Sequence, residues 1–272
     1  MINEKFTIEN KNIVLTGSSG RLGKQYAHFL SSGGANMILL DINSDTNQQL
    51  AEDIRSKYNT NCISYKCNIA NKKSVIRTSN SIIKKYSKID GLINNAGFTT
   101  SFAKKQKTKS YSSSFEDLPI ELWNQTLDVN LTGTFLCCQE FGKQMVKQKN
   151  GSIINIASHY GLIAPDQRIY GKSKLNLPIS YAASKSGIIN LTRYLAAYWR
   201  EKNIRVNTLT PGGVLDTKIQ SKDFIKKYSE KTILNRLANP DEYNGAILFL
   251  ISNASSYMTG SNLVIDGGWT AL

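Results

Sequence analysis

Two tyrosine–lysine pairs stand out as groups that could move a proton. Tyr170 and Lys174 (YGKSK), and Tyr181 and Lys185 (YAASK), each lie four residues apart. Residues at this spacing share one face of a helix. An ammonium group beside a phenol stabilises the phenolate, so it lowers the tyrosine pKa from its ordinary value of about 10. Either pair could therefore act as proton donor and acceptor near neutral pH.

The segments that follow the two tyrosines decide between the pairs. Tyr170 is followed at once by Gly171 and later by Pro178, and neither residue supports a continuous helix. Tyr181 is followed by small residues and then by an apolar stripe that includes Ile188, Leu191 and Leu195. A buried helix of this kind holds two side chains in fixed positions. We therefore predict that Tyr181 and Lys185 form the working pair.

A glycine-rich segment, TGSSGRLG at 16–23, follows the first apolar run of the chain. Glycines allow a tight turn that brings backbone N–H groups to a pyrophosphate at a helix N-terminus. Asp41 ends the next apolar run, 18 residues after Gly23. This is close to the distance expected for an acid that binds the adenosine ribose hydroxyls. A carboxylate there repels a 2′-phosphate and favours NAD over NADP, although Arg21 could attract a phosphate.

Strand-like and helix-like segments alternate along the chain, which predicts a doubly wound α/β fold. We expect a seven-stranded parallel sheet with helices on both faces and a ligand site at the carboxyl ends of the strands. Ser44 is the expected N-cap of the second helix. The predicted strands lie within 12–16, 36–41, 62–68, 89–97, 151–158, 204–213 and 262–268, and the predicted helices within 21–34, 44–58, 71–86, 118–148, 179–202 and 241–253.

The composition indicates one domain in a cytoplasmic protein. The 272 residues contain no evident linker, so we expect a single NAD(P)-binding Rossmann domain over 1–272. No apolar run approaches the roughly 20 residues of a membrane helix, and no signal pattern begins the chain. With four cysteines, two histidines and no Cys-x-x-Cys pair, reduced buried thiols are expected and a metal site is not.

The formal net charge of +14 raises the question of nucleic-acid binding. The lysines are spread over the whole chain and no basic-aromatic motif is present, so we interpret the charge as a solvated basic surface. One local cluster, KKQKTK at 104–109, is an exception. We expect neither a nucleic acid nor a membrane as partner.

Three motifs together resemble those of the short-chain dehydrogenase/reductase family: TGSSGRLG, NNAG at 94–97 and YAASK. The resemblance covers essentially the whole chain and implies reversible hydride transfer between a nicotinamide and a secondary alcohol or ketone. It implies that Tyr181 is the catalytic acid/base and that Lys185 binds the nicotinamide ribose and lowers the tyrosine pKa. Ser158 would hydrogen-bond the reacting oxygen, and Asn130 would hold a water in a proton relay.

The resemblance also implies contacts with the cofactor, which is NAD or, as the alternative, NADP. The glycine-rich segment would hold the pyrophosphate, two residues after the third strand would contact adenine, and PGGVLDT would cradle the nicotinamide. The implied contact residues are Gly17, Ser19, Gly20, Arg21, Leu22, Gly23, Asp41, Asn68, Ile69, Asn95, Ala96, Gly97, Tyr181, Lys185, Pro211, Gly212, Val214 and Thr217.

The chain departs from the family pattern in two ways. Its glycines read T-G-x-x-G-x-x-G, which is commoner in the longer sugar-nucleotide branch, and Arg21 stands where compact members have glycine. Tyr170 has the usual spacing of 12 residues from Ser158, whereas Tyr181 follows by 23. Choosing Tyr181 therefore implies an insertion at 164–179, and a second stretch of extra sequence lies at 99–115. Loops near a site usually set substrate choice.

The substrate is a small molecule, and the basic insertions favour an anionic one such as a phosphorylated or nucleotide-linked sugar. The chain also resembles, more weakly, bacterial members of the family that are linked to sugar modification and surface-glycan synthesis. A 3-oxoacyl-carrier-protein reductase is an alternative, although it would normally use NADP. A dinucleotide sensor or scaffold is the non-enzyme alternative, yet all four implied catalytic residues are present. The resemblance implies a homodimer or homotetramer packed through the long helices and the last strand.

Overall fold

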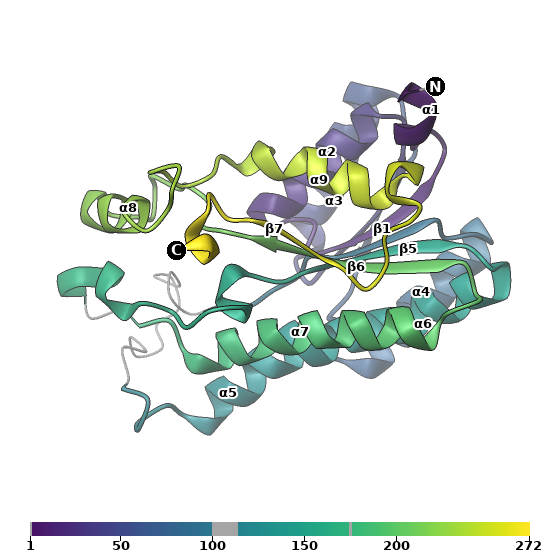
Figure 1. Cartoon of the computed structure of the whole chain (residues 1–272). Helices are drawn as coiled ribbons and strands as arrows, with labels where there is room; N and C mark the ends of the chain where they lie inside the picture. The colour runs from purple at the N-terminus through teal and green to yellow at the C-terminus, as the bar shows by residue number, and fades with distance from the viewer. Residues whose placement is uncertain (1, 100–113, 174–175) are drawn as a thin grey trace.

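The computed structural model, which describes residues 2–99, 114–173 and 176–272, contains one sheet of seven parallel strands (Figure 1). The strand order is β3-β2-β1-β4-β5-β6-β7, so the chain reverses its direction of winding between β1 and β4. This is the predicted doubly wound fold, and the prediction is confirmed. The strands are β1 (Asn12–Thr16), β2 (Asn36–Asp41), β3 (Cys62–Lys66), β4 (Gly91–Asn94), β5 (Gly151–Ile156), β6 (Ile204–Pro211) and β7 (Asn262–Ile265).

Helices cover both faces of the sheet (Figure 1). One face carries α2, α3 and α9, and the opposite face carries α4, α6 and α7. The helices are α1 (Ile2–Phe6), α2 (Arg21–Ser32), α3 (Ser44–Tyr58), α4 (Lys72–Tyr86), α5 (Ile120–Leu127), α6 (Gly133–Gln148), α7 (Ile179–Tyr198), α8 (Lys222–Ser229) and α9 (Asn244–Ile251).

Burial on both faces explains why the strands read as continuous apolar runs. In β1, Ile13 and Leu15 pack into the cluster formed with α2, α3 and α9. Val14, between them, packs into the cluster formed with α4, α6 and α7. All three side chains are fully buried, as successive residues of a strand covered on both sides must be. This packing fixes the strand ends, and with them the loops that follow.

Three local features differ from the sequence predictions. The helix expected over 118–148 is continuous, but it contains a π-helical turn at Asp128–Thr132 between α5 and α6. Helix α3 is capped by Asn43, whose side chain accepts from Thr46 N, rather than by Ser44. Helices α1 and α8 were not predicted. Both are short, and α8 lies beyond the end of the sheet (Figure 1).

The described part of the stretch 164–179, which we predicted to be an insertion, packs against α8. It contains a 3-10 segment, Gln167–Ser173, that is kinked at Gly171, where φ is +54°. Tyr170 of this segment contacts Phe224 of α8 with ring centroids 5.5 Å apart. Helix α7 begins only after Pro178, as the sequence predicted. Lys174, the KKQKTK cluster and most of 99–115 lie outside the described residues.

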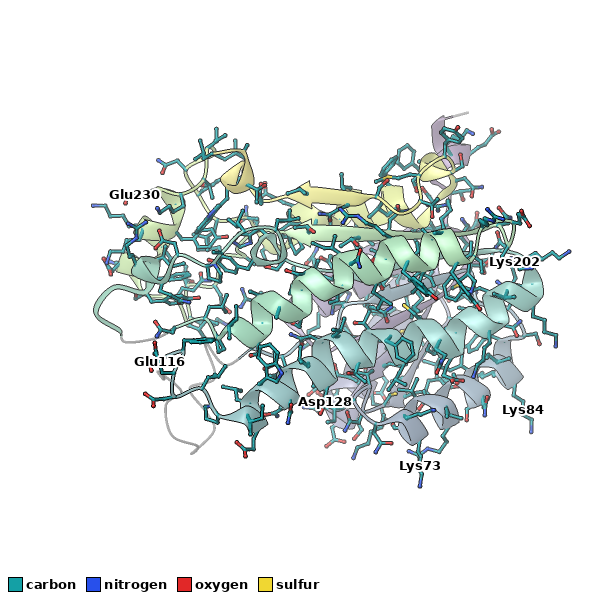
Figure 2. The ribbon with its side chains drawn as sticks, turned by 60° about the horizontal axis from the view of Figure 1, so that its bottom comes forward. Lys73, Lys84, Glu116, Asp128, Lys202 and Glu230 are labelled. Atoms are coloured by element: carbon teal, nitrogen blue, oxygen red, sulfur yellow. The ribbon has the colours of Figure 1, made fainter. Side chains whose placement is uncertain are left out.

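Exposed charges are spread over the surface. Lys73 and Lys84 project from α4 and Lys202 from the turn after α7, whereas Glu116 lies at the opposite end of the view and Asp128 between them (Figure 2). The four cysteines are free and buried, as expected. Within the described residues, no helix has both the length and the apolar character needed to cross a membrane.

Candidate functional site

A cleft of about 890 Å³ lies at the carboxyl ends of the strands and brings together most of the predicted site residues. Three of those residues do not line it: Gly23 and Asn130 are buried behind its wall, whereas Thr217 is exposed on the loop after β6. The predicted residues that line the cleft are Gly17, Ser19, Gly20, Arg21, Leu22, Asp41, Asn68, Ile69, Asn95, Ala96, Gly97, Ser158, Tyr181, Lys185, Pro211, Gly212 and Val214.

The glycine-rich loop packs closely against neighbouring backbone because its glycines have no Cβ atom. A Cβ at Gly17, where φ is +64°, would lie 2.6 Å from Ala96 Cα. A Cβ at Gly23 would collide with the carbonyl oxygen of Gly17 and would lie 2.8 Å from Ser18 Cα. Both contacts are with backbone, which cannot yield as a flexible side chain would. The loop can therefore turn tightly into α2, with Gly20 as its N-cap.

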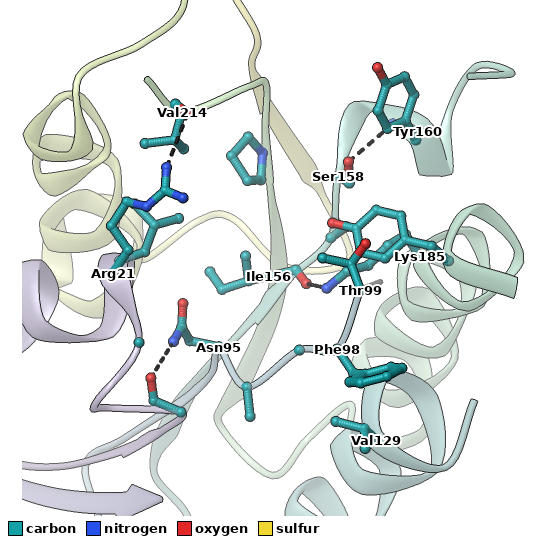
Figure 3. A pocket seen from close by; sticks show the side chains of 18 of the residues that line it. Arg21, Asn95, Phe98, Thr99, Val129, Ile156, Ser158, Tyr160, Lys185 and Val214 are labelled. Carbon is teal, nitrogen blue, oxygen red and sulfur yellow. Dashed lines mark hydrogen bonds between the residues drawn. The ribbon is translucent and has the colours of Figure 1, made fainter. Parts of the chain in front are cut away.

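Thr16 and Asn95 fasten this loop to the end of β4. Thr16 Oγ1 accepts hydrogen bonds from the backbone N–H groups of Asn95 and Ala96, each at 3.1 Å. Asn95 Nδ2 donates to the carbonyl oxygens of Thr16 and Gly17 at 3.1 and 3.0 Å (Figure 3). The NNAG motif thus sets the position of the glycine-rich loop.

Asp41 is held on the cleft wall by two backbone groups. Its Oδ2 accepts from Ser19 N and its Oδ1 from Asn43 N, both at 2.9 Å. Asn43 is also the N-cap of α3, so the helix start and the carboxylate position are linked. The carboxylate is fixed at the end of β2, the place expected for an acid that binds ribose hydroxyls.

Arg21 reaches across the cleft in the other direction. Its Nη1 donates to the carbonyl oxygen of Val214 at 3.1 Å (Figure 3). Its Nη2 lies 3.1 Å from Asp216 Oδ2. Both partners follow β6, whereas Asp41 is the last residue of β2, on the opposite side of β1 in the sheet. In this structure the Arg21 guanidinium is therefore bound by groups on the β6 side of the cleft.

The cleft fits a dinucleotide at this end. Helix α2 has no side-chain cap, so its N-terminus faces the cleft with only backbone groups. Among the described residues, Ser19 Oγ is buried without a hydrogen-bond partner, although Ser19 lines the cleft. A buried hydroxyl of this kind is normally satisfied by a partner. A bound pyrophosphate would supply acceptor oxygens for it.

Ser158 and Tyr181 meet at the other end of the cleft. Ser158 Oγ accepts from Tyr160 N at 3.2 Å and also hydrogen-bonds the Tyr181 side chain. Burial raises the pKa of Tyr181, and its hydrogen bond with Ser158 opposes that rise. The two hydroxyl groups converge on one point, where a single substrate oxygen could bind both.

Lys185 lies one turn after Tyr181 on α7 and is almost completely buried. Its Nζ donates to the carbonyl oxygen of Ile156 at 2.8 Å and lies 5.7 Å from the centre of the Tyr181 ring (Figure 3). Burial lowers the pKa of Lys185 to about 8. From the sequence we expected Lys185 to lower the Tyr181 pKa. Here burial outweighs any such effect, and the pKa of Tyr181 is raised.

Asn130 lies in the π-helical turn and is fully buried. Its Oδ1 accepts from Phe98 N at 2.6 Å, and its Nδ2 donates to Phe98 O at 3.1 Å and to Ser184 Oγ at 3.0 Å. A Cβ at Gly97 would lie 3.7 Å from both Asn130 Oδ1 and Lys185 Nζ. The glycine therefore leaves open the space between the two polar groups.

The tyrosine of the competing pair occupies a different environment. Tyr170 is buried on the cleft wall against Phe224 of α8. It belongs to a kinked 3-10 segment, not to α7, which carries Tyr181 and Lys185 on one face. The geometry places Tyr181, not Tyr170, beside Ser158.

Aromatic residues that the sequence analysis did not single out form the wall near Ser158. His159 Nδ1 lies 3.3 Å from the carbonyl oxygen of Pro211, and its Nε2 lies 3.4 Å from the Tyr228 hydroxyl. Burial lowers the pKa of His159 to about 4, so the ring is neutral at pH 7. Two features of the sequence could have predicted these lining residues. Residues 159–160 directly follow Ser158, and Phe224 and Tyr228 lie four residues apart. Further lining residues here are Tyr160, Tyr170, Leu177, Gln220 and Leu237.

Comparisons with known proteins agree with this geometry. Residues 18–270 match the model of the family described as enoyl-(acyl carrier protein) reductase. The chain is 34% identical over 270 residues to the NAD-dependent glycerol dehydrogenase of Listeria innocua, which spans 97% of this chain and 96% of that protein. It is 31% identical over 272 residues to the D-threitol dehydrogenase of Mycolicibacterium smegmatis, with 97% and 95% covered. It is 32% identical over 263 residues to the post-translational flagellin modification protein A of Campylobacter coli, with 96% and 99% covered.

Solved structures show the same fold. A short-chain dehydrogenase from Leptospira borgpetersenii with bound NAD+ is 35% identical, with a TM-score of 0.83 over 97% of this chain and 94% of that chain. A NAD+-bound xylitol dehydrogenase is 28% identical, with a TM-score of 0.84 over 96% and 99%.

Proposed function

Because the chain belongs to the short-chain dehydrogenase/reductase family, we propose that it interconverts an uncharged polyol and the corresponding ketose, with NAD as the preferred cofactor. The chain is an NAD(P)-dependent oxidoreductase that acts on a CH–OH group. The observation that carries the substrate proposal is the convergence of Ser158 and Tyr181 beside a wall of neutral aromatic side chains.

In the oxidation direction, Tyr181 accepts the proton of the substrate hydroxyl as a phenolate. Ser158 donates a hydrogen bond to the same oxygen and stabilises its developing negative charge. When bound, the nicotinamide accepts the hydride that leaves the carbon. Both side chains are held on rigid elements, Tyr181 on α7 and Ser158 at the end of β5. They therefore fix the substrate carbon on one side of the cleft.

Lys185 and Asn130 support this proton transfer. Lys185 would bind the nicotinamide ribose and return protons between Tyr181 and solvent, for which a pKa of about 8 is suited. Asn130 would hold a water beside Lys185, in the space that Gly97 leaves open. Its bonds to the Phe98 backbone fix it in that position.

The charges of the described cleft support an uncharged substrate. The charged residues that line it there are Arg21, Asp41 and Lys185, and Arg21 is paired with Asp216. Arg168, on the insertion, is paired with Asp166. The names of the glycerol, threitol and xylitol dehydrogenases agree with a small polyol substrate. An anionic sugar would need the lysines of 104–109, which lie outside the described residues.

A panel of substrates tests the proposal. Glycerol, D-threitol, D-arabinitol and xylitol are each supplied with NAD+ or NADP+, and cofactor reduction is followed by absorbance. We expect oxidation of at least one polyol with NAD+. Activity confined to sugar phosphates would restore the anionic substrate. Activity confined to 3-oxoacyl thioesters with NADPH would favour the reductase alternative, which the description of the matching family model also suggests.

Asp41 provides a test of the cofactor preference. We expect wild-type protein to bind NADH at least about tenfold more tightly than NADPH, because the Asp41 carboxylate repels a 2′-phosphate. Asp41→Ala should lose this preference through weaker NADH binding and stronger NADPH binding. Fluorescence titrations of both proteins with both cofactors measure the four affinities. Equal or tighter NADPH binding by the wild type would contradict the NAD assignment.

We also propose a homodimer or homotetramer, in which α6 and α7 pack against a second copy. Phe135 of α6 and Tyr194 and Tyr198 of α7 are 43%, 63% and 67% exposed, and the two tyrosine rings stack with centroids 5.8 Å apart. Exposed aromatic groups of this size mark interaction surfaces. Light scattering should give two or four times the chain mass of 30.3 kDa. A monomeric mass would reject the assembly.

The domain organisation and the location are part of the proposal. Residues 1–272 form a single NAD(P)-binding domain, with substrate-side insertions at 99–115 and 164–179. The packing of Tyr170 and Leu177 on the cleft wall supports the second insertion. We place the protein in the cytoplasm, where its free buried cysteines fit a reducing environment.

A further inference from the structure

The wall beside Ser158 contains a polar group with no role in the proton transfer. Among the described residues, eight buried side-chain nitrogen or oxygen atoms have no hydrogen-bond partner. Two of these atoms belong to residues that line the cleft: Ser19 Oγ at the dinucleotide end and the Tyr160 hydroxyl at the substrate end. Tyr160 as a whole is 7% exposed. A buried hydroxyl without a partner costs free energy, so its presence calls for an explanation.

Packing fixes the Tyr160 side chain near the reacting point. Its backbone N–H donates to Ser158 Oγ, so the residue begins beside the group that binds the substrate oxygen. Its ring lies 3.9 Å from the His159 ring and 5.9 Å, edge to face, from the Trp269 ring. Figure 3 shows Tyr160 rising from Ser158 at the edge of the pocket.

The Tyr160 phenol stays protonated at neutral pH. Burial raises its pKa, and so do the nearby phenols of Tyr228, Tyr170 and Tyr181 and the carboxylate of Asp166. The group therefore offers one O–H donor and an acceptor lone pair, but no charge. These are the properties needed to bind an alcohol hydroxyl.

We propose that Tyr160 is a specificity-determining residue, whose hydroxyl binds a second substrate hydroxyl on the carbon next to the reacting carbon. The inference rests on the proposed polyol function. Ser158 and Tyr181 bind the reacting oxygen, and Tyr160, two residues from Ser158, binds the adjacent one. A substrate that lacks the second hydroxyl leaves the phenol unpaired and is disfavoured.

A matched pair of alcohols and a matched pair of variants test this role. The alcohols are 2,3-butanediol and 2-butanol, which differ in the hydroxyl next to the reacting carbon. The variants are Tyr160→Phe and Tyr26→Phe. Tyr26 is also fully buried with an unpartnered hydroxyl, but it lies in the core on α2 and does not line the cleft. Each variant therefore loses one unpartnered hydroxyl oxygen, Tyr160→Phe at the cleft and Tyr26→Phe in the core.

We expect the wild type to prefer 2,3-butanediol in kcat/KM with NAD+. Tyr160→Phe should lower kcat/KM for the diol about tenfold or more and leave that for 2-butanol within about threefold. Tyr26→Phe should retain the wild-type preference. Neither variant should bind NADH more weakly or unfold at a lower temperature, because neither loses a protein hydrogen bond. If 2-butanol is not oxidised at all, a tenfold loss on the diol in Tyr160→Phe that appears in KM, with kcat within about threefold, supports the role, and a loss in kcat alone contradicts it.

Other results would overturn the role of Tyr160. These are a wild type that oxidises both alcohols equally well, a Tyr160→Phe variant that keeps the preference, and equal losses on both alcohols. Equal losses would show that the phenol supports the site through structure or a buried water. A wild type inactive on the diol and on every polyol of the panel would reject the proposed function itself, and the role of Tyr160 with it.

Discussion

Tyr181→Phe is expected to lower kcat for alcohol oxidation by about 10³-fold, because it removes the group that accepts the substrate proton. The variant keeps the ring and the packing of α7, so NADH binding should stay within about threefold of the wild type. Steady-state kinetics and a fluorescence titration measure the two effects. The loss should appear in kcat rather than in the cofactor affinity, since the phenol acts in the chemical step.

Tyr170→Phe is the matched control, because Tyr170 belongs to the other Tyr-x-x-x-Lys pair of this chain. It lines the cleft and can alter KM, but we expect its kcat to stay within about tenfold of the wild type. If Tyr170→Phe lost more activity than Tyr181→Phe, the assignment of the acid/base would be wrong.

The pH profile gives a second readout for Tyr181. Oxidation requires the phenolate, whose fraction increases with pH until the pH exceeds the pKa of the tyrosine. Burial raises that pKa, so kcat/KM for oxidation should increase from neutral towards alkaline pH. Reduction uses the protonated phenol and should decrease over the same range. The residual activity of Tyr181→Phe should lack this dependence.

The sequence was sufficient for features that depend on local pattern. The apolar runs predicted all seven strands, and because parallel strands share a carboxyl edge, Asp41, Asn95 and Ser158 were expected at one cleft. The choice of Tyr181 over Tyr170 depended on Gly171 and Pro178, whose effects on a helix are local. These local effects are present in the structure, which has a kink at Gly171 and a helix that begins after Pro178.

Features that depend on distant contacts could not be predicted in this way. The direction of the Arg21 side chain is set by Val214 and Asp216, about two hundred positions further along the chain. Helix α8 has 8 residues, too few for a strong periodic signal, and it packs against the 3-10 segment that carries Tyr170.

The pKa of Tyr181 is a further example of this limit. Spacing predicted correctly that Lys185 lies near Tyr181, but spacing carries no information on burial. Burial destabilises the charged forms of both groups, so it raises the pKa of Tyr181 and lowers that of Lys185. The ordinary pKa values of tyrosine and lysine are nearly equal, so burial moves the two values apart and favours the neutral phenol and the neutral amine.

Gly23→Ala is expected to have the largest effect on the dinucleotide site. The new methyl group would collide with the carbonyl oxygen of Gly17 and approach Ser18 Cα, so the glycine-rich loop must move away from α2. We expect the free energy of unfolding to fall by about 3 kcal/mol and NADH binding to weaken by about 100-fold or more. Denaturant unfolding and fluorescence titration measure these changes.

Gly245→Ala provides the comparison, because a Cβ at Gly245, near the start of α9, would meet no heavy atom within 4 Å. Replacing this exposed helical glycine by alanine should raise stability by up to about 1 kcal/mol and leave NADH binding unchanged. The same chemical change therefore has opposite effects at the two positions, and the difference is set by the distance to the Gly17 carbonyl. If Gly23→Ala bound NADH as tightly as Gly245→Ala does, the close backbone approach at the glycine-rich loop would not be what forms the dinucleotide site.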